Sequence, residues 1–298
     1  MRAHWALVAI ATALAGCAEE VETESLAFRC AGGSPAGLVG LDLVDISGTP
    51  SITGAVPNVF SNELVTLSGA VDLEGSAISG GEVTISGNAQ PGGDVIEYAT
   101  PIAVADPTAD VAAAKLANDN ASIPCVAKGN KCTSVVSNDK LTLSSQQKLT
   151  LETGTYYFEG ITISGQAKLD IDGAVVIYLA GGASFNGGSA TNPSSDSLTV
   201  ISSSTSDIKL TGGGSTNMHV FAPFSTVRFS GTQGFRGSAL GKELRISGTA
   251  DLEVTADLAL THGYVTCEPE PEPEPEPETS DDAGDDDGPT DPPPPQPN

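Results

Sequence analysis

A short motif, an apolar residue followed by Ser or Thr and then Gly, recurs along most of this 298-residue chain. Neighbouring copies stand about 20 positions apart; Leu67 follows Ile46 by 21 and Ile246 follows Phe229 by 17. Because Gly adopts positive φ at no steric cost, each copy predicts a strand that ends at a sharp corner. The copies begin at Ile46, Leu67, Ile85, Ile163, Leu210, Phe229 and Ile246, with a looser one at Phe185.

Between the motifs lie short runs that alternate apolar and polar residues, for example residues 168–172. Alternation predicts strands, about three per repeat. A three-stranded coil of roughly 20 residues is the unit of a parallel β-helix, whose coils stack about 4.8 Å apart around one narrow core. The sequence therefore predicts an all-β, right-handed parallel β-helix, or solenoid. A β-sandwich is the alternative, but it would not need Gly at such even spacing.

One segment departs from the strand pattern. Residues 108–117 are rich in Ala, and Asp106-Pro107 precedes them as the expected N-cap and first helical residue. We expect one helix here, packed on the side or the end of the stack and leading into a loop between Cys125 and Cys132.

The cysteines other than Cys17 predict disulfides in an exported chain. Four thiols allow three pairings, and we expect Cys125–Cys132 as a local clip and Cys30–Cys267 closing the folded region. A metal site is not expected, because Cys-x6-Cys is not zinc spacing.

The first residues have the layout of an export signal, with Arg2 before an apolar run that is too short to span a bilayer. The run ends at Leu14-Ala15-Gly16-Cys17, which resembles the bacterial lipobox. That resemblance implies cleavage before Cys17, acylation of its thiol, and an N-terminal acyl anchor in the membrane. Ala18 rather than Asp follows, which in a Gram-negative cell resembles the outer-membrane sorting rule.

The other end, residues 268–298, is rich in Glu, Asp and Pro and contains no Lys or Arg. Pro at every second position of its first part and mutual repulsion of the carboxylates predict a disordered, extended tail. The whole chain carries 38 acidic residues against 13 basic ones, which argues against nucleic acid as a partner.

Several stretches between residues 118 and 241 resemble an uncharacterised β-helical domain of bacterial surface proteins and lipoproteins. They include Asn118-Asp119-Asn120-Ala121, residues 154–158, residues 220–223 and residues 235–241, and the resemblance covers roughly 105–262. Relatives in that family are fused to pilin-assembly-type segments and are frequent in deltaproteobacteria. The resemblance implies a surface location but brings no catalytic residue and no cofactor.

An enzyme acting on acidic polysaccharides would need clustered carboxylates with a matched base. The candidate pairs are Asp170 with Asp172 and Asp251 with Glu253, each two apart on a strand and therefore on its outward face. No His neighbours either pair, so we expect no catalytic residues and no enzyme.

An outward position just before the motif carries Thr66, Thr84 and Thr162, and then Lys209, Arg228 and Arg245. If the coils are in register, the last three, here named the basic row, stack about 5 Å apart. Two interpretations stay open: the basic row binds an anionic envelope polysaccharide, or it pairs with nearby acids such as Glu243 or with the acidic tail.

These observations predict four segments: a signal peptide (1–16), a tether (17–29), a β-helix domain (30–267) with the helix and clip at about 106–132, and the tail (268–298). The predicted function is that of a lipid-anchored, non-enzymatic module for structure or interaction at the bacterial surface, most simply in the outer membrane. Its expected partners are the membrane, and an anionic polysaccharide or another envelope protein; binding or cleavage of an acidic polysaccharide is the alternative.

Overall fold

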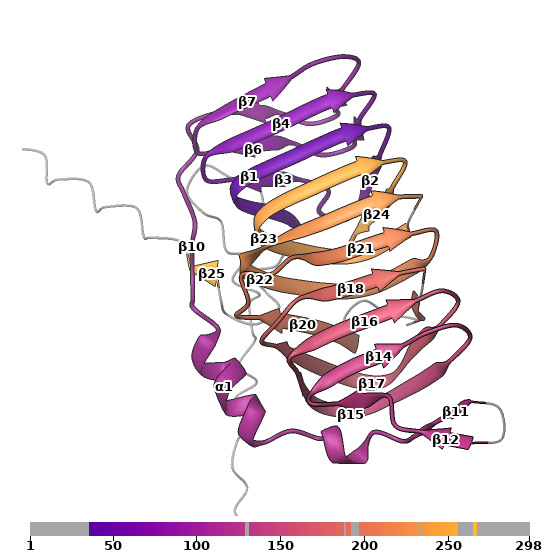
Figure 1. Ribbon diagram of the computed structural model, residues 1–298. Helices are drawn as coiled ribbons and strands as arrows, with labels where there is room; N and C mark the ends of the chain where they lie inside the picture. The colour runs from indigo at the N-terminus through magenta and orange to yellow at the C-terminus, as the bar shows by residue number, and fades with distance from the viewer. Residues whose placement is uncertain are drawn as a thin grey trace, which may run out of the picture. The chain divides into compact units, whose positions relative to one another are not determined.

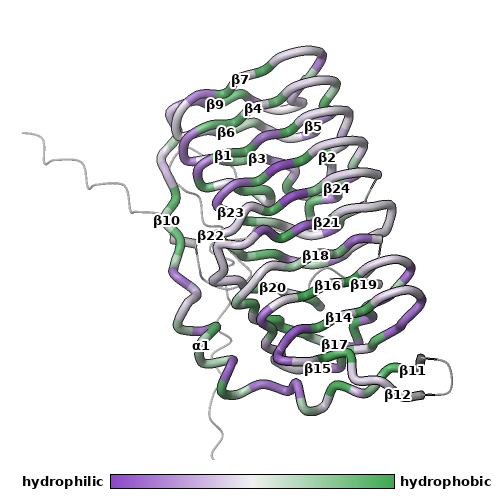
Figure 2. Tube along the Cα trace, viewed as in Figure 1, coloured by the Kyte–Doolittle hydropathy of each residue, from purple (hydrophilic) through white to green (hydrophobic). Residues whose placement is uncertain are grey.

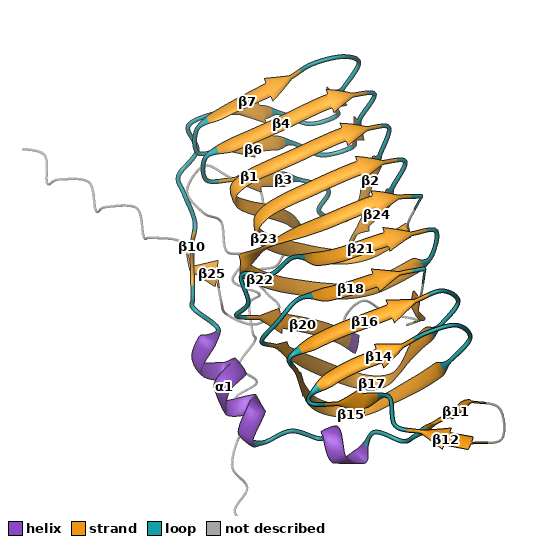
Figure 3. Cartoon of the chain, viewed as in Figure 1, coloured by secondary structure: helices purple, strands orange, loops and turns teal. Residues whose placement is uncertain are grey.

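The computed structural model describes residues 36–128, 131–187, 189–191, 197–232, 234–255 and 265–266. Most of these residues lie in strands that form a parallel β-solenoid of about 10 turns, with one α-helix beside it (Figure 3). The predicted parallel β-helix is therefore confirmed. The predicted signal peptide, tether and acidic tail lie outside the described residues.

The solenoid has three faces, each a parallel sheet with one strand per coil. Face A contains β14 (Lys140–Leu143), β16 (Gly160–Ser164), β18 (Ala183–Asn186), β21 (Ile208–Gly212), β4 (Leu64–Gly69), β7 (Glu82–Ile85) and the ends of β22 (Ser215–Gly231), β23 (Gly234–Gly248) and β1 (Leu38–Gly48). Face B contains the starts of β15 (Lys148–Phe158), β17 (Lys168–Leu179), β22 and β23, with β19 (Ser189–Thr191), β24 (Asp251–Val254), β2 (Ser51–Gly54), β5 (Asp72–Leu73) and β8 (Gln90–Pro91). Face C contains β20 (Leu198–Ser202), β3 (Val59–Ser61), β6 (Ala77–Ser79), β9 (Val95–Ile96) and the remaining parts of the long strands.

The recurring motif turns the chain between face A and face B. Its glycines all have positive φ, at Gly48, Gly69, Gly87, Gly165, Gly187, Gly212, Gly231 and Gly248. These corners stack directly: a Cβ on Gly248 would lie 2.8 Å from the carbonyl oxygen of Gly231 in the neighbouring coil. The corner role predicted for the motif is therefore correct, and the close approach adds a second reason for Gly.

The core is a set of apolar rows that run along the stack. The residue before each corner forms one such row, with the order Leu143, Ile163, Phe185, Leu210, Phe229, Ile246, Ile46, Leu67 and Ile85. All of these side chains are buried except Ile85, which belongs to the last coil and is 40% exposed. Burial of each apolar side chain stabilises the fold by roughly 1.5–3 kcal/mol, and every coil adds one such side chain to the row.

The coils do not stack in the order in which the chain makes them. On face A, β1 pairs on one side with β23 and on the other with β4, so the N-terminal coils lie on the last C-terminal coil. Figure 1 shows this as indigo strands directly beside orange ones. The sequence pattern did not reveal this order.

The N-terminal and C-terminal coils meet in one coil, here named the joint, to which both parts of the chain contribute strands. Strands β23 and β24 supply its faces A and B, and residues 38–40 of β1 fill the position on face C between residues 239–241 and β3. The start of the described chain therefore completes a coil that the end of the solenoid begins.

An outward apolar row on face C explains the path of the connecting segment. It runs through Tyr157, Tyr178, Ile201, Phe221, Leu240, Val39, Phe60, Ile78 and Ile96. Ala99, Ile102 and Val104 cover part of this row, and Val111 and Ala114 of helix α1 (Thr108–Leu116) cover Tyr157 and Tyr178. Figure 2 shows hydrophobic colouring at β10 (Ala103–Val104), which pairs with β25 (Val265–Thr266) beside the stack.

Helix α1 lies on the side of the stack, one of the two predicted places, but starts one residue later than expected. Its N-cap is Pro107 rather than Asp106, and its first residue is Thr108. The Asp106 carboxylate still accepts a hydrogen bond from the Thr108 N–H at 2.8 Å, so it serves the first turn from one position further out.

The two ends of the solenoid differ. At one end, Asp119 and Asn120 bind the edge of β15 on face C: the Asn120 amide donates to the Tyr157 carbonyl at 2.6 Å and accepts from its N–H at 3.1 Å. A 3-10 turn (Asn120–Ser122), β11 (Val126–Lys128), β12 (Lys131–Thr133) and β13 (Val136–Ser137), which pairs with β14, follow there. At the other end, β7, β8 and β9 each pair with one neighbour among the described strands.

Candidate functional site

The basic row lies on face A in the predicted register. Lys209 pairs with Arg228, and Arg228 pairs with Arg245, in three successive coils. Adjacent parallel strands lie about 4.8 Å apart, which sets the spacing of these three positions. Their side chains are 37–51% exposed.

Three carboxylates contact the three cations, two from positions beside the row and one, Asp45, from the next coil in line with it. Asp207 accepts from Arg228 Nε at 2.9 Å and lies 3.8 Å from Lys209 Nζ. Glu243 accepts from Arg245 Nε at 2.8 Å, and Asp45 lies 3.4 Å from Arg245 NH1. The three cations and three acids balance in charge, and because all are partly exposed, each pair contributes roughly 0.2–1 kcal/mol.

Polar residues in the same outward position continue the basic row toward both ends of the stack. Thr142, Thr162 and Ser184 precede Lys209 along the stack, while Asp45, Thr66 and Thr84 follow Arg245. A second outward row, of Ser and Thr, runs beside it and includes Thr211, Ser230 and Ser247. Face A is therefore a long polar surface with paired charges in its middle.

The two candidate acid pairs both lie on the outer surface of face B. Asp170 is 2.5 Å from Lys148 Nζ in the adjacent coil, and Glu253 is 3.5 Å from Arg236 Nε. Asp172, Asp251 and Glu253 are exposed. Between Asp170 and Asp251 lie the coils that contain β19, β22 and β23, so the two pairs do not converge on one point.

A hollow opens on face B beside the second pair. It has a volume of about 310 Å³, and its lining includes Arg236, Asp251 and Glu253 together with Ser215, Asn217, Gly234 and Phe235. The sequence pattern indicated the two carboxylates but not the hollow. The sequence signal for the hollow is Gly234, a glycine in a strand that has no place in the corner motif.

A smaller hollow of about 200 Å³ lies near the capped end, between residues 122–124 and the strand β15. Leu151, Glu152 and Tyr156 line it from β15. The Tyr156 hydroxyl donates to the carbonyl of Glu152 at 3.0 Å, so this polar group of the lining already has a partner in its own strand.

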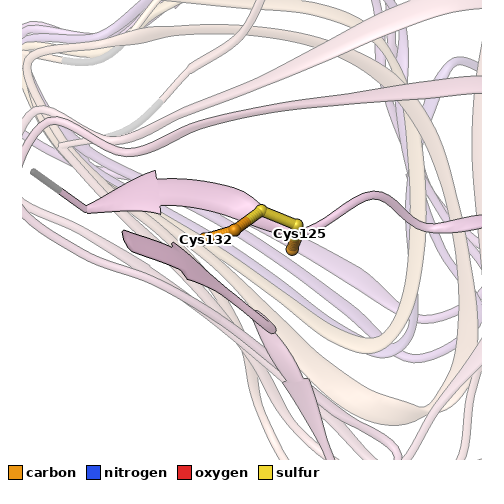
Figure 4. The surroundings of a disulfide bond; sticks show 2 residues. All are labelled: Cys125 and Cys132. Carbon is orange, nitrogen blue, oxygen red and sulfur yellow. A yellow bond between two sulfur atoms is a disulfide. The ribbon is translucent and has the colours of Figure 1, made fainter. Parts of the chain in front are cut away.

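Cys125 and Cys132 form a disulfide with a Cα–Cα distance of 5.4 Å, as predicted for the local clip (Figure 4). The bond joins the start of β11 to β12 in a short antiparallel hairpin. Cys17, Cys30 and Cys267 lie outside the described residues. Among the described residues, no group of three or more His, Cys, Asp or Glu side chains is arranged to hold a metal ion.

No helix within the described part of the chain has the length and apolar character needed to cross a bilayer. Comparison of the chain with protein-family models, with curated proteins and with solved structures gives no match.

Proposed function

We propose that this protein is a lipid-anchored, exported module of the bacterial envelope that acts in structure or interaction and not as an enzyme. The lipobox-like Leu14-Ala15-Gly16-Cys17 supports the anchor, and the resemblance to an uncharacterised β-helical domain of surface proteins supports the location. Ala18 after the cysteine favours the outer membrane of a Gram-negative cell.

The observation that carries the non-enzymatic part is the lateral pairing of charge on the outer faces. Asp207, Glu243 and Asp45 contact the basic row, while Asp170 and Glu253 contact Lys148 and Arg236 of adjacent coils. The coils that contain β19, β22 and β23 lie between the two candidate acid pairs, so these pairs do not face one substrate bond together. Glycosidic cleavage instead needs an acid and a base that face one bond from opposite sides.

The anchor is tested in a Gram-negative host by following Cys17→Ala beside the natural chain. The natural chain is expected in the outer-membrane fraction of a density gradient and in the detergent phase of a Triton X-114 separation. Cys17→Ala is expected to leave both. Retention of the variant in the membrane fraction would contradict acylation at Cys17 as the anchor.

Binding of an anionic polysaccharide on face A is a second candidate. The register of the basic row favours it, because three partly exposed cations in successive coils match a repeating anion in spacing. We would measure binding of oligogalacturonate and of a sulfated oligosaccharide at low and high salt. A chain with Lys209, Arg228 and Arg245 changed to Gln should lose salt-sensitive binding if this function is correct, and binding that the substitutions leave unchanged would exclude it.

A further inference from the structure

We propose that the hollow on face B, here named the face B groove, binds one neutral sugar residue of a glycan. The groove is defined by Ser215, Asn217, Gly234, Arg236, Asp251 and Glu253. This inference goes beyond the proposed function, since it concerns a different face and an uncharged ligand.

The size of the groove fits one sugar ring. Its volume of about 310 Å³ stands at the lower end of the range for small-molecule sites, which is roughly 300–1,000 Å³. Its groups come from three successive coils, in β22, β23 and β24. A glycan could therefore enter with one ring seated and the next continuing along the stack.

Gly234 opens the groove, and neither its backbone nor its surroundings require glycine there. Its φ is outside the left-handed region, and a Cβ would find its nearest atom, Ser215 Oγ, at 3.6 Å, an ordinary contact. The neighbours in the same outward row, Ser215 and Asp251, both carry side chains. Gly inside a strand is destabilising relative to Ala, and it often marks a place where a ligand approaches the backbone closely.

The chemistry around the groove suits hydroxyl groups that both donate and accept. The carboxylates of Asp251 and Glu253 accept hydrogen bonds, the Arg236 guanidinium donates, and Ser215 and Asn217 can do both. Arg236 Nε and Glu253 Oε1 stand 3.5 Å apart and both side chains are about half exposed, so their contact is loose. A vicinal diol can reach between them without breaking a tight ion pair.

The charges select a neutral ligand over the ionic alternatives. Two carboxylates and one guanidinium give the groove a net negative charge, which disfavours uronic acids, sulfates and phosphates. The guanidinium of Arg236, beside Glu253, disfavours a divalent cation. A neutral hexose or N-acetylhexosamine avoids both penalties.

The test measures binding of cellotetraose, chitotetraose, maltotetraose and mannotetraose to the mature chain carrying Cys17→Ala, by calorimetry. At least one should bind, and Gly234→Trp, which fills the groove, should weaken that binding at least tenfold. Asp251→Asn and Arg236→Gln should each weaken it about tenfold, which corresponds to about 1.4 kcal/mol, because each variant removes the charge from a hydrogen-bonding partner of the sugar.

The matched control is Gly160→Trp on face A. A Cβ on Gly160 would also meet only ordinary contacts, 3.6 Å from the Gly182 oxygen and 3.8 Å from Lys140 Cγ, and this variant should bind as the parent chain does. The proposal is overturned if none of the four neutral oligosaccharides binds or if Gly234→Trp binds like Gly160→Trp. It is also overturned if only oligogalacturonate binds and the basic-row substitutions abolish that binding, a result that would support face A instead.

Discussion

Arg245 NH1 lies 3.4 Å from Asp45 Oδ2, although 200 positions of the chain separate the two residues. Their contact lies at the joint where the N-terminal coils meet the last C-terminal coil. In a solenoid that stacked in chain order, these two side chains would be at opposite ends.

The contact predicts that charge reversal at the joint can be rescued across it. Arg245→Asp places a third carboxylate beside Asp45 and Glu243, and we expect it to lower the free energy of unfolding by about 1 kcal/mol. Adding Asp45→Arg should recover part of that loss in urea denaturation. The control combines Asp45→Arg with Lys209→Asp, which is in the same row but two coils from Arg245, and no recovery is expected. Equal recovery of the free energy of unfolding in the two double variants would contradict the contact between Asp45 and Arg245 at the joint.

The stacked corners predict two opposite outcomes for the same substitution. Gly248 has a φ of 89° and its Cβ would lie 2.8 Å from the Gly231 oxygen, so Gly248→Ala should destabilise the protein by roughly 1–3 kcal/mol. Gly234 has neither constraint, and Gly234→Ala should be neutral or stabilise by roughly 0.4–1 kcal/mol. Denaturation midpoints of the two variants provide the check. A comparable loss in both would mean that Gly234 is also needed for the backbone.

Glu97 contacts the edge strand at the end of the stack where, among the described strands, β7 pairs on one side only. Its carboxylate accepts a hydrogen bond at 2.9 Å from the N–H of Val83 in the edge strand β7. Apolar side chains are exposed at this end, with Ile85 at 40%, Val95 at 49% and Tyr98 at 74%. Because exposed strand edges with apolar neighbours pair with other chains, Glu97→Ala should cause concentration-dependent association.

Sedimentation velocity of Glu97→Ala checks this expectation against Glu63→Ala, which removes the same charge from the adjacent coil. Only Glu97→Ala removes the acceptor of the Val83 N–H in β7, so only that variant should associate. Two monomeric variants would show that Pro91 in β8 and the remaining acids protect the edge without Glu97.

The attachment of helix α1 should depend on pH. Lys115 Nζ lies 2.8 Å from Glu159 Oε1 and 5.5 Å from the centre of the Tyr157 ring. The hydrogen bond and charge of Lys115 lower the pKa of Glu159 from its ordinary 4.5, and Glu159 in turn raises the pKa of Lys115 from 10.5. The contact is therefore complete between these ordinary values; it is lost as pH falls through the lowered pKa of Glu159 or rises through the raised pKa of Lys115.

Hydrogen-exchange protection factors of the helix amides, followed across pH, check this attachment. Protection should fall at both extremes in the natural chain. Lys115→Met keeps the aliphatic stem but removes the charge, so its protection should be lower in the middle range and should lack the two transitions. The same profile in both chains would assign helix attachment to Val111 and Ala114 alone.

The fold was predictable from local chemistry, because Gly favours a corner at the end of a strand and these corners recur at the length of one coil. The basic row followed from the same register, and the pairing of Arg245 with Glu243 is between near neighbours on one strand. The stacking order was not predictable in this way, since every coil presents a similar apolar row and could stack on any other. The contact of Asp45 with Arg245 depends on that order.

A signal that face C is covered was present in the sequence. Residues 175–179 are apolar without alternation. Such a run is typical of a strand covered on both faces. It indicates that this face of the stack is covered, but not which segment covers it. The face B groove could not be predicted from the corner motif, because Gly234 lies in a strand and belongs to no copy of that motif.

The joint places the points where the described chain first enters and finally leaves the solenoid inside the stack, between the coils of β23 and β1. Leu38 is next to Ala239, and the Thr255 N–H donates to the Gly237 carbonyl. If the proposed acyl chain on Cys17 holds the protein, its tether joins the solenoid between the two ends of the stack, so that a long side of the rod is attached rather than an end.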